Sequence, residues 1–319
     1  MLRKTKKIVI LGAGKVGSAS AFILAADGLG SEIVLIDSNK EKAQGEAMDI
    51  IQGSSVNNKP IRIYAGDYAD AEGADIVVVT MGMPRKPGQT RLDLAQCNVD
   101  IIRETMPEVA RRAPHAIYIV VSNPVDIITH AILKYTNLDR RQVIGSGTML
   151  DTARLRSLLS RHMDINAHNV HAFVFGEHGD TAVIPWSLVT VAGMSMIEYC
   201  ENICVMHNHC RKLELRDIEN DMRTSGGKII ALKGATYYAI ALVVKRMCEA
   251  VIGDAKSTLT VSSMLQGEYG IHDVCLSIPY LIGAHGIIKP MPPTLAEDEL
   301  KALHASADAL KKVIAELKW

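Results

Sequence analysis

The sequence lacks an excess of charge of either sign. Its 35 lysine and arginine residues balance 35 aspartate and glutamate residues, and its pI lies near 7.2. A chain without net charge creates no general field that attracts nucleic acid or an anionic membrane surface. We therefore expect neither a nucleic-acid partner nor a membrane partner.

Long hydrophobic runs and regularly paired cysteines are also missing. No stretch approaches the roughly 18 consecutive apolar residues of a membrane span. The six cysteines show no paired spacing, which excludes a disulfide scaffold. A chain of 319 residues has ample material for a core, so we expect a soluble, cytoplasmic protein with two lobes or one large α/β domain.

One segment contains a cluster of potential metal ligands: Cys200, Cys204, His207, His209 and Cys210. Cys200 and Cys204 are four apart and would share a helical face, as in a soft-metal site. The cluster has no CxxC pair, however, and lies inside an apolar and amphipathic run over residues 196–215. We interpret these residues as structural and expect no metal.

A glycine fingerprint opens the chain. The apolar run 7–11 ends in Gly12, Gly14 and Gly17 with GxGxxG spacing, and a helical pattern follows over 18–29. The first glycine permits a tight turn, the second lets a pyrophosphate approach the backbone, and the third lets helix and strand pack closely. The helix N-terminus then faces the phosphates with its partial positive charge.

An acidic residue supports the nucleotide interpretation. A second apolar strand, 32–36, ends in Asp37, which lies 20 positions after Gly17. A carboxylate there accepts both ribose hydroxyls and repels a 2′-phosphate, so NAD is favoured over NADP. The alternative is an ordinary βαβ turn without a ligand.

Strands and helices alternate through the first half, which predicts a doubly wound, parallel Rossmann sheet. Asn123 follows one strand, where the ligand crevice of such a sheet lies. No linker divides the chain, so we set a soft boundary between a dinucleotide-binding domain, 1–147, and a mixed α/β catalytic domain, 148–319. The further elements expected in the first domain are strands 75–80, 116–121 and 143–147 and a helix over 92–112.

The second half has weaker patterns. Thr294 and Glu297 form a capping-box pattern before an apolar stripe from Leu300 to Leu317. The other expected elements are a helix over about 148–161, strands 182–191, 258–264 and 274–282, a helix through about Gly226 and another over 228–251.

A histidine between glycines is the main catalytic candidate. His178 lies in Gly-Glu-His-Gly-Asp after the apolar run 170–175, and histidine exchanges protons near neutral pH. Asp151 and Arg154 are three apart and share a helical face. Taken alone, the histidine could be a buried structural residue, and the other two a weak surface ion pair.

The segment 81–91 links a buried strand to a helix and contains two prolines, two glycines and three basic residues. It could close over a substrate as a lid, with Arg85 and Arg91 facing the ligand. The alternative is a solvated basic loop.

Seven motifs then resemble the L-lactate and L-malate dehydrogenase family. They are GAGKVG, the strand-end Asp37, PRKPGQTRLDL, VSNPVD, LDTARLR, GEHGD and KGATYYAIA, in this order. The resemblance covers essentially the whole chain. It implies a Rossmann domain with strand order 3-2-1-4-5-6, a mixed α/β catalytic domain, a tetramer or dimer, and a role in glycolysis or fermentation.

The resemblance implies roles for single residues. His178 matches the catalytic histidine, Asp151 its orienting carboxylate, Arg154 the arginine that forks onto the substrate carboxylate, and Arg91 the arginine that polarises the reacting carbonyl. Asn123 matches a residue that contacts the substrate oxygen beside the nicotinamide. The remaining matches are Thr236 in the substrate pocket and cofactor contacts at Gly12, Gly14, Val16, Gly17, Asp37, Gly82, Ser146 and Ile240.

One position departs from the lactate pattern. The lid residue that sorts substrates is usually glutamine in lactate dehydrogenases and arginine in malate dehydrogenases, and here it is Arg85. TRLDL, the glutamate of GEHGD and Thr236 resemble the lactate branch. We expect a lactate-type, NAD-dependent 2-hydroxy-acid dehydrogenase in which Arg85 favours or adds oxaloacetate activity, with a malate dehydrogenase as the alternative.

The sequence disfavours two other classes of protein. A non-catalytic NAD-binding protein would need only the glycine loop, not His178, Asp151, Arg154 and Arg91 together. The short-chain dehydrogenase class has a tyrosine and a lysine with the spacing YxxxK, and no such pair occurs in this sequence. Arg156 and His171 also match positions at which related bacterial enzymes bind fructose 1,6-bisphosphate, so this sugar bisphosphate is a candidate effector.

Overall fold

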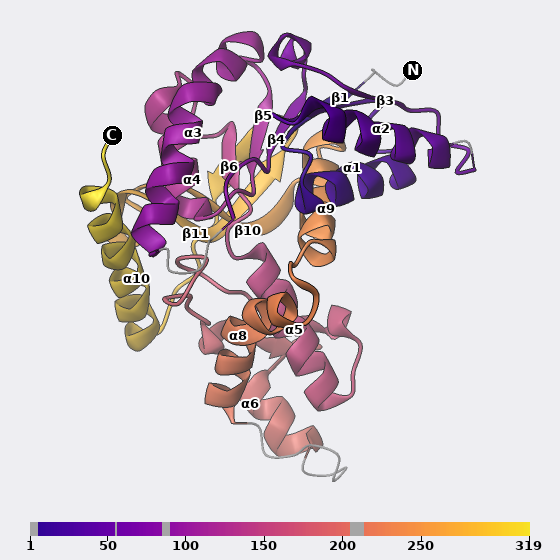
Figure 1. The fold of residues 1–319 in the computed structure, drawn as a ribbon. Helices are drawn as coiled ribbons and strands as arrows, with labels where there is room; N and C mark the ends of the chain where they lie inside the picture. Colours follow the sequence, from indigo (N-terminus) through magenta and orange to yellow (C-terminus); the bar gives the residue numbers. More distant parts are fainter. Residues whose placement is uncertain (1–5, 55, 85–89, 205–213) are drawn as a thin grey trace.

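The computed structural model describes residues 6–54, 56–84, 90–204 and 214–319. Its centre is a nine-stranded sheet of order β12-β11-β10-β6-β5-β4-β1-β2-β3 (Figure 1). Six strands of it come from the first half: β1 Lys7–Leu11, β2 Glu32–Ile36, β3 Arg62–Ala65, β4 Ile76–Val79, β5 Ile117–Val120 and β6 Val143–Gly145.

These six strands are parallel and run in the order 3-2-1-4-5-6. Their central members are short runs of mostly β-branched residues, and β4 and β5 are buried along their whole length. A parallel strand covered on both faces is expected to be continuously apolar in this way. The predicted doubly wound Rossmann sheet is therefore confirmed.

Two groups of helices cover the faces of the sheet. The helices α1 Lys15–Asp27, α2 Lys40–Ser54 and α9 Tyr238–Ile252 lie together on the right of Figure 1. The helices α3 Arg91–Arg112, α4 Val125–Tyr135 and α10 Glu297–Glu316 lie on the left. Because α9 and α10 come from the second half, both halves of the chain build the layers over one sheet.

The second half also extends the sheet itself. The strands β10 Ser257–Gln266, β11 His272–Gly283 and β12 Gly286–Pro290 are antiparallel, and β10 pairs with β6. The rest of this half forms the lower part of Figure 1, with α5 Met149–Met163, α6 Met196–Tyr199 and α8 Leu215–Lys233. Its small sheet consists of β7 Val170–His171, β8 Thr190–Val191 and β9 Met194–Ser195.

Short helical turns complete the structure. The 3-10 turns are η1 Tyr68–Ala71, η2 Ala167–Asn169, η3 Trp186–Leu188 and η5 Glu268–Gly270, and Cys200–Cys204 forms a π-helical turn, η4. The lower part has its own apolar core, which includes Leu155, Leu159, Val174 and Met222. This core holds α5 and α8 against the small sheet.

Three expectations about the second half are wrong. No continuous strand covers 182–191, because Pro185 begins the turn η3 there and proline has no N–H for a strand ladder. The helix break expected between residues 226 and 228 does not occur: α8 continues to Lys233, Gly234 ends it with a φ of +81°, and the next helix, α9, begins at Tyr238 rather than at 228. Thr294 does not cap the last helix, since its N-cap is Ala296, whose N–H donates to the Glu299 carboxylate.

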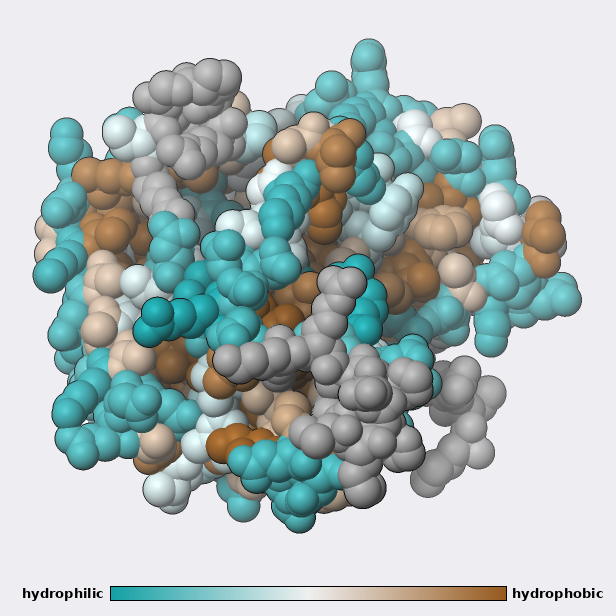
Figure 2. Space-filling view, turned by 90° about the horizontal axis from the view of Figure 1, so that it is seen from below, coloured by the Kyte–Doolittle hydropathy of each residue, from teal (hydrophilic) through white to brown (hydrophobic). Residues whose placement is uncertain are grey.

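No helix in the described ranges is long and apolar enough to cross a membrane. The face in Figure 2 is largely hydrophilic, and hydrophobic residues reach it in separate patches.

Candidate active site

Five predicted site residues follow the carboxyl ends of parallel strands. Gly12 follows β1, Asp37 follows β2, Gly82 follows β4, Asn123 follows β5 and Ser146 follows β6. Parallel neighbours end at the same edge of a sheet, so these residues lie along one edge. This edge is the ligand crevice of an open α/β sheet.

The glycine loop fits a dinucleotide. A Cβ on Gly17 would lie 1.8 Å from the carbonyl oxygen of Gly12, so only glycine fits there. A Cβ on Gly14, by contrast, would meet nothing within 4 Å, which leaves open space for a pyrophosphate beside the backbone. Asp37 lies beside the loop and accepts the main-chain N–H of Ala13 at 2.7 Å. The residues present therefore suit NAD.

The helices beside the loop carry the remaining cofactor candidates. Val16 lies in the first turn of α1, and Ile240, which is 9% exposed, lies in the first turn of α9. α1 and α9 pack against each other. Thr236 is half-buried in the segment that joins α8 to α9. Their contacts with a cofactor or substrate remain predictions.

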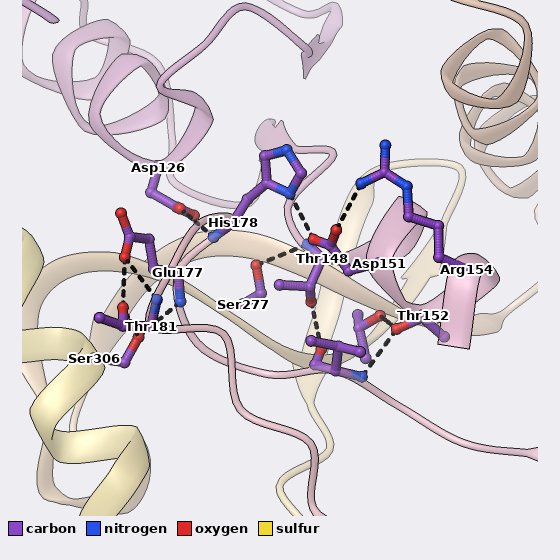
Figure 3. Close-up of polar contacts among 12 residues, drawn as sticks. Asp126, Thr148, Asp151, Thr152, Arg154, Glu177, His178, Thr181, Ser277 and Ser306 are labelled. Atoms are coloured by element: carbon purple, nitrogen blue, oxygen red, sulfur yellow. Dashed lines mark hydrogen bonds and ion pairs between the residues drawn. The ribbon is translucent and has the colours of Figure 1, made fainter. Parts of the chain in front are cut away.

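A buried aspartate joins the candidate catalytic histidine to an arginine. His178 Nδ1 lies 2.5 Å from Asp151 Oδ2, and Arg154 Nη1 lies 3.0 Å from Asp151 Oδ1 (Figure 3). The Asp151 side chain is only 7% exposed, whereas that of His178 is 24% exposed. The His178 ring and the Arg154 guanidinium lie on the same side of Asp151, above it in Figure 3. Because Nδ1 is engaged, Nε2 is the nitrogen that can exchange a proton with a ligand.

Electrostatics favour a charged imidazole. Burial alone would lower the pKa of His178, but the charge and hydrogen bond of Asp151, with a further contribution from the charge of Asp126, raise it above its ordinary value. Burial opposes ionisation of Asp151 as well. The positive charges of His178 and Arg154 prevail and lower the pKa of this carboxyl. The pair is therefore suited to hold a proton on the imidazole near neutral pH.

The main chain before His178 is tied to α5 and β11. Val174 accepts a hydrogen bond from the Thr148 hydroxyl and donates its N–H to Thr152 Oγ1 at 2.9 Å. Gly176 exchanges two main-chain hydrogen bonds with Ser277 of β11. The strand-like segment is thus fixed before the catalytic loop begins.

The loop itself is tied to α10 and α4. The Glu177 N–H donates to Ser306 Oγ at 2.9 Å, and the His178 N–H donates to Asp126 Oδ2 at 2.9 Å (Figure 3). Asp126 lies in the first turn of α4. His178 is therefore anchored twice, through its ring by Asp151 and through its main chain by Asp126.

A buried asparagine connects two segments of the crevice. Asn98 of α3 is 3% exposed, and its Oδ1 accepts the N–H of Met83 at 2.7 Å. Its Nδ2 donates to the carbonyl oxygen of Asn123 at 2.7 Å. Asn98 also packs against Gly82, where a Cβ would lie 3.1 Å from Oδ1. One side chain thus fixes the backbone at Gly82, Met83 and Asn123.

Sequence reasoning assigned no role to Asp126, Ser306 or Asn98. Asp126 stands within the SNPVD motif, and that motif was its only signal. Ser306 lies 129 positions from its partner Glu177, a separation at which no local pattern links them. Asn98 lies in the middle of an amphipathic helix, where an asparagine reads as an ordinary polar residue.

Some predictions fall outside the described residues. These are Arg85, the side chain of Arg91, and most of the cysteine and histidine cluster, including His207, His209 and Cys210. Within the described ranges, no group of three or more metal-ligating side chains gathers in one place.

The effector candidates are neighbours. Arg156 Nε donates to the carbonyl oxygen of Ala172 at 3.0 Å, and its guanidinium lies over the ring of Phe173. His171, on the other side of Ala172, is exposed on β7.

Comparison with known families gives two matches along the chain. Residues 6–145 match the family described as lactate/malate dehydrogenase, NAD binding domain, and residues 148–318 match lactate/malate dehydrogenase, alpha/beta C-terminal domain. These agree with the expected cofactor and family.

Similar proteins are named as lactate dehydrogenases. L-lactate dehydrogenase 1 of Clostridium acetobutylicum is 45% identical over 311 residues, 98% of each chain. The L-lactate dehydrogenase of Acetivibrio thermocellus is 44% identical over 312 residues, covering 98% of this chain and 97% of its own. Among solved structures, the minor L-lactate dehydrogenase of Enterococcus mundtii is 34% identical with a TM-score of 0.93, covering 98% of this chain and 99% of its own.

Proposed function

The chain belongs to the lactate/malate dehydrogenase family, and from this premise we propose that it is an NAD-dependent L-lactate dehydrogenase that reduces pyruvate. The observation that carries the proposal is the His178–Asp151–Arg154 cluster, because an NAD-binding protein without catalysis would not need it. The names of the relatives at 44–45% identity agree with it.

The proposed chemistry begins with substrate placement. Arg154, held by Asp151 and 15% exposed, presents its guanidinium to the carboxylate of the keto acid. Gly226 of α8 leaves room for it, since a Cβ there would lie 3.3 Å from Arg154 Nη2. Asn123, at the end of β5, is assigned to the substrate oxygen beside the nicotinamide, and Arg91 to polarising the carbonyl.

Proton transfer follows from the hydrogen bonding of His178. Its Nδ1 is bound by Asp151, so Nε2 donates the proton to the keto oxygen. NADH, held by the glycine loop and Asp37, would supply the hydride to the carbonyl carbon. Asp151 holds the ring in one orientation and stabilises its positive charge, as in other histidine–aspartate pairs. In the oxidising direction the neutral imidazole takes the proton back.

The test is NADH oxidation by the purified protein with pyruvate and with oxaloacetate, measured separately. Turnover of pyruvate supports the proposal. Binding of NADH without turnover of either keto acid would instead indicate a non-catalytic NAD-binding protein.

A second activity, reduction of oxaloacetate, is favoured by Arg85. Pyruvate presents a methyl group where oxaloacetate presents a second carboxylate. An unpaired guanidinium in a closed pocket is costly, whereas the carboxylate pairs with it. We therefore expect oxaloacetate turnover beside pyruvate turnover. An L-malate dehydrogenase is the alternative, and exclusive use of oxaloacetate in the same assay would select it.

We further propose a cytoplasmic homotetramer or homodimer with the domain boundary between residues 147 and 148. Large apolar side chains are exposed on α1, α2, α8 and α9 and favour self-association: Phe22, Met48, Ile230, Leu232, Tyr238 and Leu242. Light scattering on the purified protein tests the oligomeric state.

Fructose 1,6-bisphosphate is the proposed effector at Arg156 and His171. Their adjacency around Ala172 supports a shared anion site. Identical pyruvate saturation curves with and without the sugar bisphosphate would reject the effector.

A further inference from the structure

A second buried carboxylate binds the catalytic histidine, at its main chain rather than at its ring. Asp126 is 3% exposed, and its Oδ2 accepts the His178 N–H at 2.9 Å. Among the described residues, its Oδ1 has no hydrogen-bond partner. A buried carboxylate with one free oxygen is costly, so its presence calls for a compensating role.

The buried Ser262 lies near Asp126 and in a tightly packed part of the sheet. A Cβ on the neighbouring Gly145 would lie 2.9 Å from Ser262 Cβ. The buried Ser262 hydroxyl is close enough to lower the pKa of Asp126, yet its geometry does not complete a hydrogen bond. Of the two charges that act on this carboxyl, that of His178 favours its ionised form and that of Glu177 opposes it.

We propose that Asp126 is a positioning residue for the reaction, which fixes the main chain of His178 and acts with Asp151 to keep its imidazole protonated. The inference rests on the proposed function, because the proton on His178 is the one delivered to the keto oxygen. Two carboxylates then share the anchoring of His178. Asp151 orients the ring, and Asp126 holds the backbone and supplies a second negative charge.

The charges around His178 support this division. Asp151 and Arg154 face it from α5, with opposite effects on its pKa. Asp126 faces it from α4 and raises its pKa. Glu177, the preceding residue, acts on Asp126 and raises the pKa of that carboxyl. The buried thiol of Cys275 on β11 also lies near Asp126, and burial keeps it protonated and neutral.

Asp126 remains ionised where the enzyme would work. Burial raises the pKa of the Asp126 carboxyl to about 6, while the N–H and charge of His178 oppose this rise. At pH 7 and above, the carboxylate is therefore charged. The negative charge of Asp126, beside the main-chain N–H of His178, is therefore present in the pH range in which His178 begins to lose its proton.

The test compares Asp126→Asn with Ser306→Ala by kcat/KM for pyruvate between pH 5.5 and 9. Asparagine keeps an acceptor for the His178 N–H but removes the charge. The control removes the acceptor of the adjacent Glu177 N–H and no charge. We expect kcat/KM of Asp126→Asn to fall at least about threefold at pH 8.5 and less than about twofold at pH 6. Only in the alkaline range does the rate depend on how firmly His178 keeps its proton. Ser306→Ala should change kcat/KM by the same factor at both pH values.

Equal losses at both pH values in Asp126→Asn would overturn the proposal and leave Asp126 a purely structural anchor. If this variant does not fold, Asp126→Ser, which keeps a hydroxyl acceptor without the charge, takes its place. The titration of His178, followed by NMR of histidine labelled with ¹³C at Cε1 and assigned with His178→Gln, separates the two proposals. Absence of pyruvate turnover in the wild type defeats the proposed function alone, whereas an unchanged His178 midpoint in Asp126→Asn defeats the inference about Asp126.

Discussion

The glycine loop and the histidine loop are built in opposite ways. Gly12, Gly14 and Gly17 lie within six consecutive positions between β1 and α1, and only Thr80 and Met81, which follow β4, approach Gly12 or Gly17 from elsewhere in the chain at the distances that decide the fit. His178 and the residues before it are tied to α5, β11, α10 and α4, with partners up to 129 positions away. The glycine spacing of the cofactor loop is thus a local pattern, whereas the contacts that fix the proton donor come from four distant elements.

The largest expected effect separates the two regions directly. His178→Gln removes the proton donor but leaves the glycine loop and Asp37 untouched. We expect kcat for pyruvate reduction to fall by about 10² to 10⁴-fold, the usual contribution of general acid catalysis, with NADH affinity nearly unchanged. Stopped-flow turnover and NADH fluorescence titration measure the two quantities. Full activity in this variant would remove His178 from the mechanism.

The glycine loop should divide into a packing glycine and a ligand glycine. Gly17→Ala places a methyl group 1.8 Å from the Gly12 carbonyl oxygen, so we expect a loss of about 3 kcal/mol or more in the free energy of unfolding. Gly14→Ala meets nothing within 4 Å and should cost less than about 1 kcal/mol, while NADH binding weakens. Urea unfolding and NADH titration of both variants test this contrast. Equal losses of stability would mean that the loop is uniformly packed.

Arg85 belongs to neither the glycine loop nor the histidine loop, and the sequence alone predicts its effect on substrate choice. Arg85→Gln should raise the ratio of kcat/KM for pyruvate to that for oxaloacetate by at least about tenfold, or roughly 1.4 kcal/mol of differential transition-state binding. The residue would then discriminate by pairing with the second carboxylate. An unmoved ratio would mean that the rest of the pocket sets the preference.

The smallest expected effect concerns stability at Asp126. Its pKa is raised from 3.8 to about 6, so its contribution to stability is present below pH 3.8 and is lost as the pH rises through about 6. Between pH 5 and pH 7.5 the wild type should therefore lose about 1.4 kcal/mol relative to Asp126→Asn, which does not titrate. Urea unfolding of both proteins at the two pH values measures this difference. A constant difference would show that Asp126 does not titrate in this range.

The sequence was most informative where structure is local. The strand 32–36 coincides with β2, and the strand–turn–helix of the glycine loop formed as expected, because hydrophobic runs and glycine spacing determine both. The strand expected over 182–191 does not form, because Pro185 starts a turn. The Ser187 N–H and hydroxyl in this turn donate to the carboxylate of Glu299 in α10, which lies 112 positions away.

The candidate site shows the same limit. His178, Asp151 and Arg154 were identified from their motifs, and the structure places them in one hydrogen-bonded cluster. Gly226 does not end a helix as expected; it lies inside α8, where the absence of a side chain leaves space for the Arg154 guanidinium. Asp126 and Ser306 act through main-chain contacts between distant elements, which no local pattern encodes.

The central claim is that a protonated His178 donates to the keto acid, and the pH dependence of kcat/KM in both directions tests it most directly. Because Asp151 and Asp126 raise the pKa of His178 above its ordinary 6.5, pyruvate reduction should persist through neutral pH and fall as the pH rises through that pKa. Oxidation of L-lactate needs the neutral imidazole and should rise over the same range. Profiles that move in the same direction, or that both survive in His178→Gln, would contradict the account.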